Sequence, residues 1–510
     1  MQSIASKRGS SSHNHNPFVA LKQHGATEES GEVYGINLVY SGNFSMEIEV
    51  DARNTARLLG GINPTDFTWH LEPGETFTSP EAVMVFTDKG VGEMSRIFHR
   101  TYMKHLIKSP WRDVERPVLI NSWEAAYFDF DDDKLVAFAH EAAKMGVDML
   151  VMDDGWFGHR NNDDSSLGDW YVNEKKLKGG LSQLIERVNA EGLKFGIWYE
   201  PEMISPDSEL YKAHPDWCLH VKGRENSPAR LQYVLDMSRE DVRDNIFEQM
   251  CSVLKNNKID YVKWDFNRNI TEAGSALLPA NRQKEIMHRF VLGTYDLMNR
   301  FVTTFPDILF ENCSGGGGRF DPGMLYYSPQ IWCSDNTDAI ERLTIQFGTS
   351  LCYPISTFGA HVAARPRTSL ATRANVAMCG TFGYELDPRK LTDEEKEQVK
   401  EQIRDYRKYN KLVREGDFYR LIAPTDDLFR CAWQFVSPDK KETMVTSVIM
   451  RRPETEFYML RLRGLDADTL YTDADTGEVY SGALLMRAGI NLTGLLYDDG
   501  ESVVKHLIAE

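Results

Sequence analysis

The segment YVKWDFNR (residues 261–268) is an apolar run that stops at Asp265, directly beside a tryptophan. A second segment, QIWCSDNTDA (residues 330–339), repeats the arrangement with Asp335 close behind another tryptophan. In a (β/α)8 barrel the carboxyl ends of the parallel strands surround one mouth, so acidic residues at those ends point into a shared pocket. The two segments therefore predict a polar site above an apolar barrel core.

Six further segments have a similar form, and helical stretches separate them, which is typical of an eight-stranded (β/α)8 or TIM barrel. Asp265 is then expected at the end of the fifth strand and Asp335 at the end of the seventh. The eight predicted strands are PVLINSW (117–123), MLVMDDGW (149–156), LKFGIWYE (193–200), LQYVLDMS (231–238), YVKWDFN (261–267), ILFENCS (308–314), QIWCSD (330–335) and CYPISTF (352–358).

Alternating apolar and polar residues flank the barrel region on both sides. Residues 32–86 include GINLVYSGNFSMEIEV, which predicts antiparallel strands joined by Gly and Pro turns. A charged helix is expected over residues 391–413, starting at Thr392, and β segments such as FRCAWQFV follow it. We expect an α/β protein with a short N-terminal β region and linker helix over 1–108, a barrel over 109–405 and a C-terminal antiparallel β-sandwich over 406–510.

Composition excludes several classes of protein. The chain has 510 residues, of which 42% are hydrophobic, enough for a large core and smaller domains. A net charge of −18 without a Lys/Arg cluster argues against a nucleic-acid partner. No apolar run is long enough for a membrane span, and the start lacks a signal-peptide core, so a cytoplasmic protein is expected. Seven cysteines without CxxC or zinc-type spacing fit a reducing compartment.

Two carboxylates that face one pocket suggest glycoside hydrolysis with retention, in which one attacks the anomeric carbon and the other protonates the leaving oxygen. We assign Asp265 as the nucleophile because Lys263, two residues earlier on the same strand face, favours an ionised carboxylate. Asp335 is assigned as the acid/base, since Trp332 provides a less polar environment. Asp338 is an equal candidate on these grounds, and its alternative is a helix-start cap.

Other polar and aromatic residues at strand ends are candidates for sugar binding. Asp153 and Asp154 would be costly to bury unless they accept hydrogen bonds, which sugar hydroxyls donate; the alternative is a DDG turn. Trp123 and Trp198 can stack on a sugar or simply fill the top of the barrel. Arg230 is a further hydrogen-bond donor that could bind the sugar. The alternative is that it is a solvent-exposed residue without a function.

Lys263 and Asn267 are, with Arg230, donors that can bind the 2- and 3-hydroxyls of a sugar. The run CSGGGGRF (313–320) lacks the Gly-Lys-Ser/Thr ending of a phosphate loop, so its glycines are expected to let backbone approach a sugar. His140 and Glu141 begin like HExxH, but the second histidine is missing. We therefore expect neither a metal ion nor a cofactor.

The motifs VMDDGWFGHRNNDDSSLGDW, WYEPEMISPDSELYKAHPDWCLH, KWDFNRN, ENCSGGGGRFDPG and SDNTDA follow one another along the chain. This ordered set resembles the α-galactosidases (melibiases) of glycoside hydrolase family 36, and the resemblance covers nearly the whole chain. It implies a retaining enzyme that hydrolyses terminal α-D-galactosyl residues from melibiose and raffinose-type oligosaccharides by double displacement, through a covalent galactosyl-aspartate.

The resemblance also implies roles for individual residues. It places the nucleophile at Asp265 and the acid/base at Asp335. It also implies that Asp153 and Asp154 bind the axial 4-hydroxyl and the 6-hydroxyl of galactose. The remaining substrate contacts that it implies are Arg230, Lys263, Asn267, Cys313 and Gly316.

Bacterial tetrameric members of the family begin with a large β-supersandwich domain, most of which is expected to be absent here, so that residues 1–108 would be its remnant and the linker helix. Because that domain reaches a neighbouring subunit's pocket in the tetramers, a homo-oligomer is a further expectation. One alternative is a galactoside-binding remnant that needs the missing domain or a partner for turnover. Another is a barrel enzyme with strand-end carboxylates as metal ligands, which is less favoured because no histidine stands there.

Overall fold

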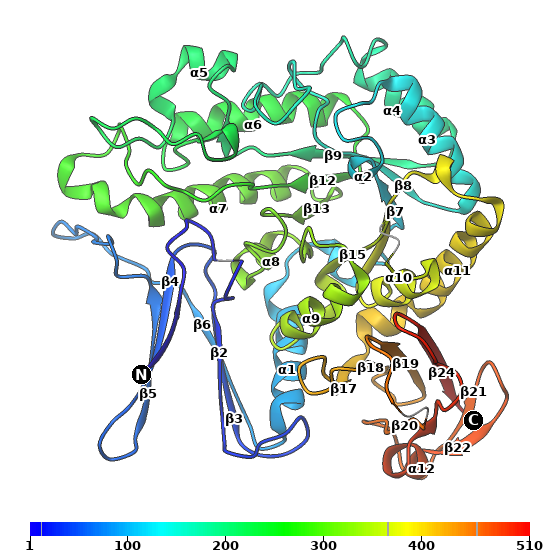
Figure 1. Cartoon of the computed structure of the whole chain (residues 1–510). Coiled ribbons are helices and arrows are strands. Elements are labelled where there is room, and N and C mark those ends of the chain that lie inside the picture. Colours follow the sequence, from blue (N-terminus) through cyan, green and yellow to red (C-terminus); the bar gives the residue numbers. More distant parts are fainter. Residues whose placement is uncertain (12, 365–366, 455–456) are drawn as a thin grey trace.

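The fold is built around a closed barrel of eight parallel strands, and the computed structural model describes residues 1–11, 13–364, 367–454 and 457–510 (Figure 1). The expected (β/α)8 barrel is therefore confirmed. Its strands are β7 (Leu119–Asn121), β8 (Met149–Met152), β9 (Lys194–Tyr199), β12 (Tyr261–Trp264), β13 (Leu309–Asn312), β14 (Gln330–Trp332), β15 (Phe358–Ala363) and β16 (Thr381–Glu385).

Two of the eight predicted strands were wrong. Residues 231–238 contain only β11 (Tyr233–Val234), which pairs with β10 (Met203–Ile204) outside the barrel. The segment 352–358 is a turn followed by a 3-10 helix (Ile355–Thr357) that leads into β15, the seventh barrel strand. The eighth strand, β16, has the sequence TFGYE. Because it contains a glycine and two polar residues, it does not form the apolar run from which the other strands were predicted. Asp265 therefore follows the fourth barrel strand and Asp335 the sixth.

Helices connect successive barrel strands and cover the outside of the barrel. The N-cap side chain of Asp131 and the left-handed Gly146 set the ends of α3. The expected helix start at Thr392 is confirmed, and Thr392 forms a capping box with Glu395 at the start of α11. Ser238, just before α6, does not cap that helix, because its hydroxyl donates to Asp236. The main helices are α2 (Trp123–Ala126), α3 (Asp132–Met145), α4 (Gly180–Ala190), α5 (Glu209–Ala213), α6 (Glu240–Asn256), α7 (Ile286–Thr304), α8 (Pro322–Tyr327), α9 (Ala339–Thr349), α10 (Leu370–Ala377) and α11 (Asp393–Glu415).

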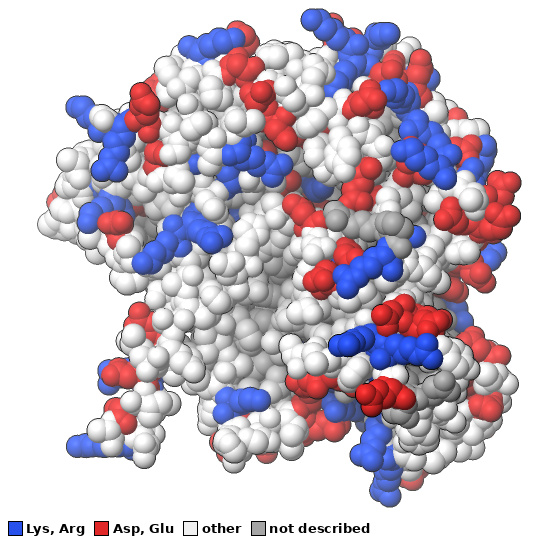
Figure 2. Space-filling view, in the orientation of Figure 1, with Lys and Arg blue, Asp and Glu red and all other residues white. Residues whose placement is uncertain are grey.

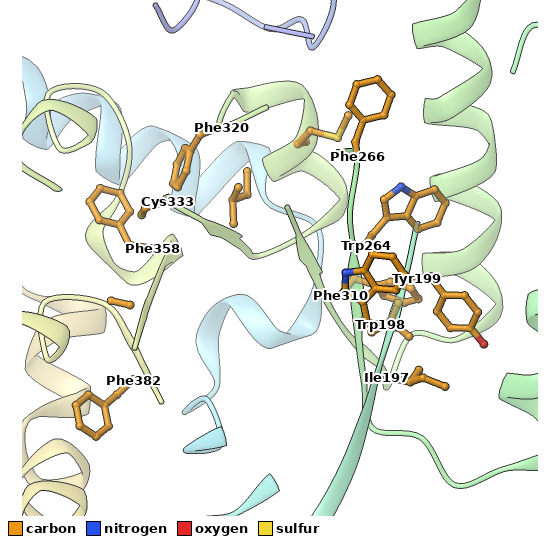
Figure 3. Close-up of a cluster of buried hydrophobic side chains, with 14 of the residues drawn as sticks. Ile197, Trp198, Tyr199, Trp264, Phe266, Phe310, Phe320, Cys333, Phe358 and Phe382 are labelled. Atoms are coloured by element: carbon orange, nitrogen blue, oxygen red, sulfur yellow. The ribbon is translucent and has the colours of Figure 1, made fainter. Parts of the chain in front are cut away.

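Large apolar side chains pack on the barrel strands and hold the pocket loops above them. Figure 3 shows Trp264 and Tyr199 grouped beside the helix on one side, and Phe320 near Phe358 on the other. The rings of Phe320 and Phe358 meet edge to face at 5.4 Å between centroids. The residues at the strand ends thus stand on a close-packed base.

Two three-stranded antiparallel sheets form the N-terminal part and extend away from the barrel (Figure 1). The helix α1 (Gly90–Thr101), which runs on into a π-helix (Tyr102–Leu106), leads from these sheets toward the barrel. The strands are β1 (Gln2–Ala5), β4 (Phe44–Val50) and β5 (Ala56–Ile62) in one sheet, and β2 (Phe18–Lys22), β3 (Val33–Leu38) and β6 (Ala82–Thr87) in the other.

The N-terminal part contacts the glycine-rich loop of the barrel. The hydroxyls of Ser11 and Ser41 donate to the two carboxylate oxygens of Asp321, at 2.8 and 2.6 Å. The side-chain amide of Asn16 donates to the carbonyl of Phe320 at 2.7 Å. These contacts fasten the first residues of the chain to the segment that follows β13.

A six-stranded antiparallel sheet forms the C-terminal part, in agreement with the expected β domain. Side chains of β18 alternate between its faces: Trp433 and Phe435 join the main core, whereas Ala432 and Val436 pack under a small second layer. That layer comprises β20 (Met459–Leu460), β23 (Ile490–Asn491) and α12 (Gly482–Arg487). The sheet order is β17 (Asp417–Ile422), β18 (Arg430–Val436), β19 (Glu442–Ile449), β24 (Ser502–Ala509), β21 (Leu470–Asp473) and β22 (Val479–Ser481).

Acidic and basic side chains are interspersed over the face shown in Figure 2, without a broad region of positive charge. Among the described residues, no helix combines the length and the apolar character that crossing a membrane would require.

A buried ion pair links the segment after the third barrel strand to the glycine-rich loop. Glu202 is completely buried, and its oxygens accept from Trp264 Nε1 at 2.9 Å and from Thr294 Oγ1 at 3.0 Å. Arg319 lies 2.9 Å from the same carboxylate and is also buried. The pair is a structural element below the mouth of the barrel.

We expect Glu202→Ala to lower the free energy of unfolding by about 3–5 kcal/mol, because it leaves the Arg319 guanidinium buried without a counter-charge. Denaturant unfolding followed by tryptophan fluorescence measures the change. Glu209→Ala is the matched control, since Glu209 pairs with Lys212 at the exposed surface and such pairs contribute about 1 kcal/mol or less. Equal losses for the two variants would contradict a stabilising buried pair.

Candidate active site

The loops at the carboxyl ends of the barrel strands enclose a cavity of about 220 Å³. All the predicted site residues except Cys313 and Gly316 line it. A larger cavity of about 620 Å³ lies near Met103, Val413 and Phe418, where no barrel-strand end contributes. The smaller cavity is the candidate active site, and its walls comprise Trp123, Glu124, Tyr127, Asp153, Asp154, Trp198, Arg230, Lys263, Asp265, Asn267, Trp332, Asp335, Thr337 and Glu385.

Asp265 directly follows β12 and is buried in the floor of the pocket. Its Oδ1 accepts from the backbone N–H groups of Phe266 at 2.8 Å and Gly315 at 3.2 Å. Its Oδ2 accepts from the indole N–H of Trp198 at 3.2 Å. The carboxylate is thus held in one orientation by donors from strand β9, from its own loop and from the loop after β13.

The surroundings of Asp265 favour its ionised form. Burial by itself would raise the pKa of this carboxyl, but the Lys263 ammonium and hydrogen bonds from Asn267, Cys313 and Phe266 outweigh burial and lower it. An ionised carboxylate in a buried pocket can act as a nucleophile toward a bound substrate.

Asp335 lies on the loop after β14 and remains exposed in the pocket. The indole N–H of Trp332 donates to its Oδ1 at 3.0 Å. Partial desolvation and the nearby charge of Asp265 raise the pKa of Asp335, while Lys263 and Trp332 offset part of the rise. The pKa values of Asp265 and Asp335 are therefore shifted in opposite directions, as a pair with distinct acid and base functions requires.

Asp338, the other candidate for the acid/base, caps a helix. It is the N-cap of α9, and its Oδ1 accepts from the backbone N–H groups of Ile340 at 3.0 Å and Glu341 at 3.1 Å. The helix-cap interpretation of this residue is confirmed.

Asp153 and Asp154 are both buried at the end of β8, and each is paired with a cation. Asp153 accepts from Asn121 at 2.7 Å and from Lys263 Nζ at 3.0 Å. Arg160 donates to both oxygens of Asp154, with Nη2 at 2.8 Å from Oδ2. Burial is the largest effect on Asp154 and raises its pKa, although Arg160 opposes it. The DDG turn alone does not explain these buried contacts, which orient two acceptors at the pocket wall.

The predicted tryptophans and the arginine occupy different positions in the pocket. Trp198 is buried and orients Asp265, so it also forms part of the barrel top. Trp123 is partly exposed and meets the ring of Tyr127 at 5.2 Å in an edge-on contact. Arg230 lies on a loop outside the barrel strands, with a left-handed φ of 53°, and its side chain reaches to 3.9 Å from Asp163.

Cys313 and Gly316 lie behind the pocket wall. The Cys313 thiol is a hydrogen-bond partner of Asp265, and burial raises the pKa of this thiol. Gly316 has a φ of +89°, and a Cβ at this position would stand 2.9 Å from the backbone nitrogen of Asp335. A glycine here lets the loop after β13 approach the loop that carries Asp335.

Sequence reasoning missed two buried glutamates of the site, Glu200 and Glu385. Glu200 follows β9 and accepts from Gln232 Nε2 at 2.8 Å and from the backbone of Asn267. Burial and the Asp265 charge raise its pKa to about 7. Burial likewise raises the pKa of Glu385 to about 8. Glu200 follows a strand that was predicted, so it could have been identified as an acidic residue at a strand end. Glu385 ends the strand that was missed.

Three family models match successive parts of the chain. Residues 76–416 match the melibiase model, residues 1–72 the N-terminal domain of glycosyl hydrolase family 36, and residues 430–507 the C-terminal domain of that family.

Curated relatives are similar to the chain over almost its whole length. Alpha-galactosidase AgaA of Geobacillus stearothermophilus is 53% identical over 96% of this chain and 68% of its own length. Alpha-galactosidase Mel36A of Lactobacillus acidophilus is 50% identical over 95% of this chain and 67% of its own length. The crystal structure of an AgaA variant in complex with raffinose has a TM-score of 0.98 and 52% identity, covering 100% of this chain and 71% of that chain.

Proposed function

The chain belongs to glycoside hydrolase family 36, and from this premise we propose that it is a retaining α-galactosidase. Its substrates are terminal α-D-galactosides such as melibiose and raffinose-type oligosaccharides. The observation that carries the proposal is the pair of carboxyls in one pocket, Asp265 with a lowered pKa and Asp335 with a raised one. The raffinose complex of the Geobacillus relative supports the class of substrate.

In the first half of the reaction, the Asp265 carboxylate attacks the anomeric carbon and forms a covalent galactosyl ester. The bond from the anomeric carbon to the leaving oxygen breaks, and Asp335 gives its proton to that oxygen. In the second half Asp335, now a carboxylate, takes a proton from water, and the water oxygen attacks the anomeric carbon. The ester bond breaks, galactose leaves with its original configuration, and both carboxyls return to their starting states.

Recognition of galactose rests on groups whose orientation is set before substrate binds. Asp153 and Asp154, each held by its cation, accept hydrogen bonds from the axial 4-hydroxyl and the 6-hydroxyl. The 2- and 3-hydroxyls accept hydrogen bonds from Arg230, Lys263 and Asn267. Because the cations and backbone donors already fix these side chains, little orientational freedom is lost when the sugar binds.

The remaining elements of the proposal concern organisation and location. We infer an N-terminal β part over residues 1–108, a catalytic barrel over 109–405 and a C-terminal β domain over 406–510. All seven cysteines are free and buried, which supports a reducing, cytoplasmic environment. We also infer a homo-oligomer, and light scattering of the purified chain would measure its mass.

We expect the purified chain to release nitrophenol from p-nitrophenyl α-galactoside with a kcat/KM at least about 100-fold above that for the α-glucoside. The reason is that the equatorial 4-hydroxyl of glucose leaves a buried acceptor at Asp153 or Asp154 unpaired. The α-N-acetylgalactosaminide serves as a second comparison. A folded protein without turnover would instead indicate a galactoside-binding protein that requires a partner, and equal rates on the galactoside and the glucoside would contradict the assigned specificity.

A further inference from the structure

Glu385 lines the pocket at the end of β16, but the proposed reaction gives it no role. Its side chain is buried, and its Oε1 lies 3.1 Å from Nδ1 of His361 on the neighbouring strand β15. Within the part of the chain that the structure describes, no hydrogen bond reaches its Oε2. Since Glu385 is part of the pocket wall, Oε2 is the oxygen that a bound sugar can meet.

The cations near Glu385 are engaged by other groups. Lys263 Nζ donates to Asp153, and the Arg342 guanidinium donates to the backbone carbonyls of residues 334, 336 and 359. Two like charges, Asp153 and Asp335, also act on Glu385. A buried carboxyl in these surroundings is more stable in its neutral form, and burial accordingly raises the pKa of Glu385 to about 8.

His361 determines which oxygen of Glu385 carries the proton. Burial lowers the pKa of this imidazole to about 3, so it is neutral. Its Nε2 is buried and has no hydrogen-bond partner among the described residues. A proton on Nε2 would be a buried donor without an acceptor, so the ring proton belongs on Nδ1 and is donated to Oε1. The acidic proton of Glu385 then resides on Oε2.

We propose that Glu385 is a further substrate-binding residue, which donates a hydrogen bond from Oε2 in its neutral carboxylic acid form to an oxygen of the bound sugar. The proposal rests on the proposed α-galactosidase function. Asp153 and Asp154 accept hydrogen bonds from the sugar, whereas Glu385 supplies a donor to the same ligand. Ionisation of Glu385 removes this donor and places another negative charge near Asp335, so substrate capture weakens as the pH rises through about 8.

Several groups face Glu385 from the elements packed around β16, and Asp335 among them also titrates during catalysis. The test therefore removes the titration of Asp335. The facing groups are Glu124 on α2, Asp153 after β8, Lys263 on β12, Asp335 after β14, Arg342 on α9 and His361 on β15.

The experiment measures kcat/KM for an activated aryl α-galactoside as a function of pH in the Asp335→Asn background, where proton donation to the leaving group is not needed. We expect activity in this background to fall as the pH rises, at a pH below about 8, because the Asp335 charge no longer raises the pKa of Glu385. The fall should disappear when Glu385→Gln is added. Glu385→Ala should lower kcat/KM at pH 6 by about 10-fold or more, and Glu385→Gln by less, because the amide keeps a donor. Glu311→Gln is the matched control, a buried barrel glutamate outside the pocket, and should keep the fall.

Difference infrared spectroscopy of wild type against Glu385→Gln gives a readout that does not depend on turnover. We expect a carboxylic acid carbonyl band at pH 6 that shifts when galactose is added and vanishes above pH 9. Absence of the band, or a band that galactose does not shift, would overturn the inference. An unchanged pH profile in Glu385→Gln, with an active wild type, would do the same. An inactive wild type that fails to bind galactose would instead refute the proposed function.

Discussion

Replacing Asp265 with alanine is expected to abolish hydrolysis, with a loss in kcat/KM on the order of 10⁴-fold or more for every α-galactoside. The variant lacks the carboxylate that forms the covalent intermediate, whose two oxygens are held by Trp198, Phe266 and Gly315. Initial rates with p-nitrophenyl α-galactoside measure the loss. A variant that kept most of the rate would eliminate Asp265 as the nucleophile.

The stereochemistry of rescue by azide distinguishes a lost nucleophile from a damaged fold. In Asp265→Ala, azide can occupy the space of the carboxylate and attack the anomeric carbon directly, which yields the β-galactosyl azide. A folded variant that gives this product lacks only the nucleophile. Asp265→Asn is the isosteric companion, since its amide keeps the volume without the charge. An α-galactosyl azide from either variant would mean that another residue forms the intermediate.

Asp335→Ala is expected to show losses that depend on the leaving group. For raffinose, whose leaving alkoxide needs a proton, we expect kcat/KM to fall by about 10²–10⁴-fold. For an aryl galactoside with an acidic phenol, kcat/KM should fall by less than about 10-fold, because protonation contributes little to that step. Parallel measurements on the two substrates test the acid role directly.

The matched control for Asp335 lies three residues along the same loop. Asp338→Ala removes the cap of α9 and should cost about 1 kcal/mol of stability without changing the ratio of rates on the two substrates. Equal losses on raffinose and on the aryl galactoside for Asp335→Ala would rule out the acid/base assignment. A substrate-dependent loss in Asp338→Ala would transfer that role to Asp338.

Much of the barrel could be predicted because its apolar strands end abruptly in polar residues, as at Trp264 and Asp265. The two errors have a common physical origin. β16 contains Gly383 between polar ends, and its burial depends on contacts with neighbouring strands that no local pattern records. β11 sits in a segment of strand-like composition but pairs outside the barrel. In both cases the pairing with other strands in the folded protein, and not the local sequence, determines whether the segment is a barrel strand.

The candidate site was predictable where a residue type and a strand end coincided, as at Asp153, Lys263 and Asp335. Glu385 could not be found without its strand. The partners that set the ionisation of the site also could not be predicted from the sequence. Arg160 reaches Asp154 from the following loop, and His361 reaches Glu385 from the neighbouring strand. Such contacts depend on the packing of the whole barrel mouth.

The hydrogen bond between Ser11 and Asp321 spans 310 residues of chain. During synthesis at about 5–20 residues per second, Ser11 is made roughly 15–60 s before Asp321. Throughout that interval Ser11, Asn16 and Ser41 have no acceptors on the barrel, and the sheet edges remain open to other chains. Donors made early therefore have no acceptor until the loop beside the nucleophile has been made, so newly made protein orders its catalytic loop late.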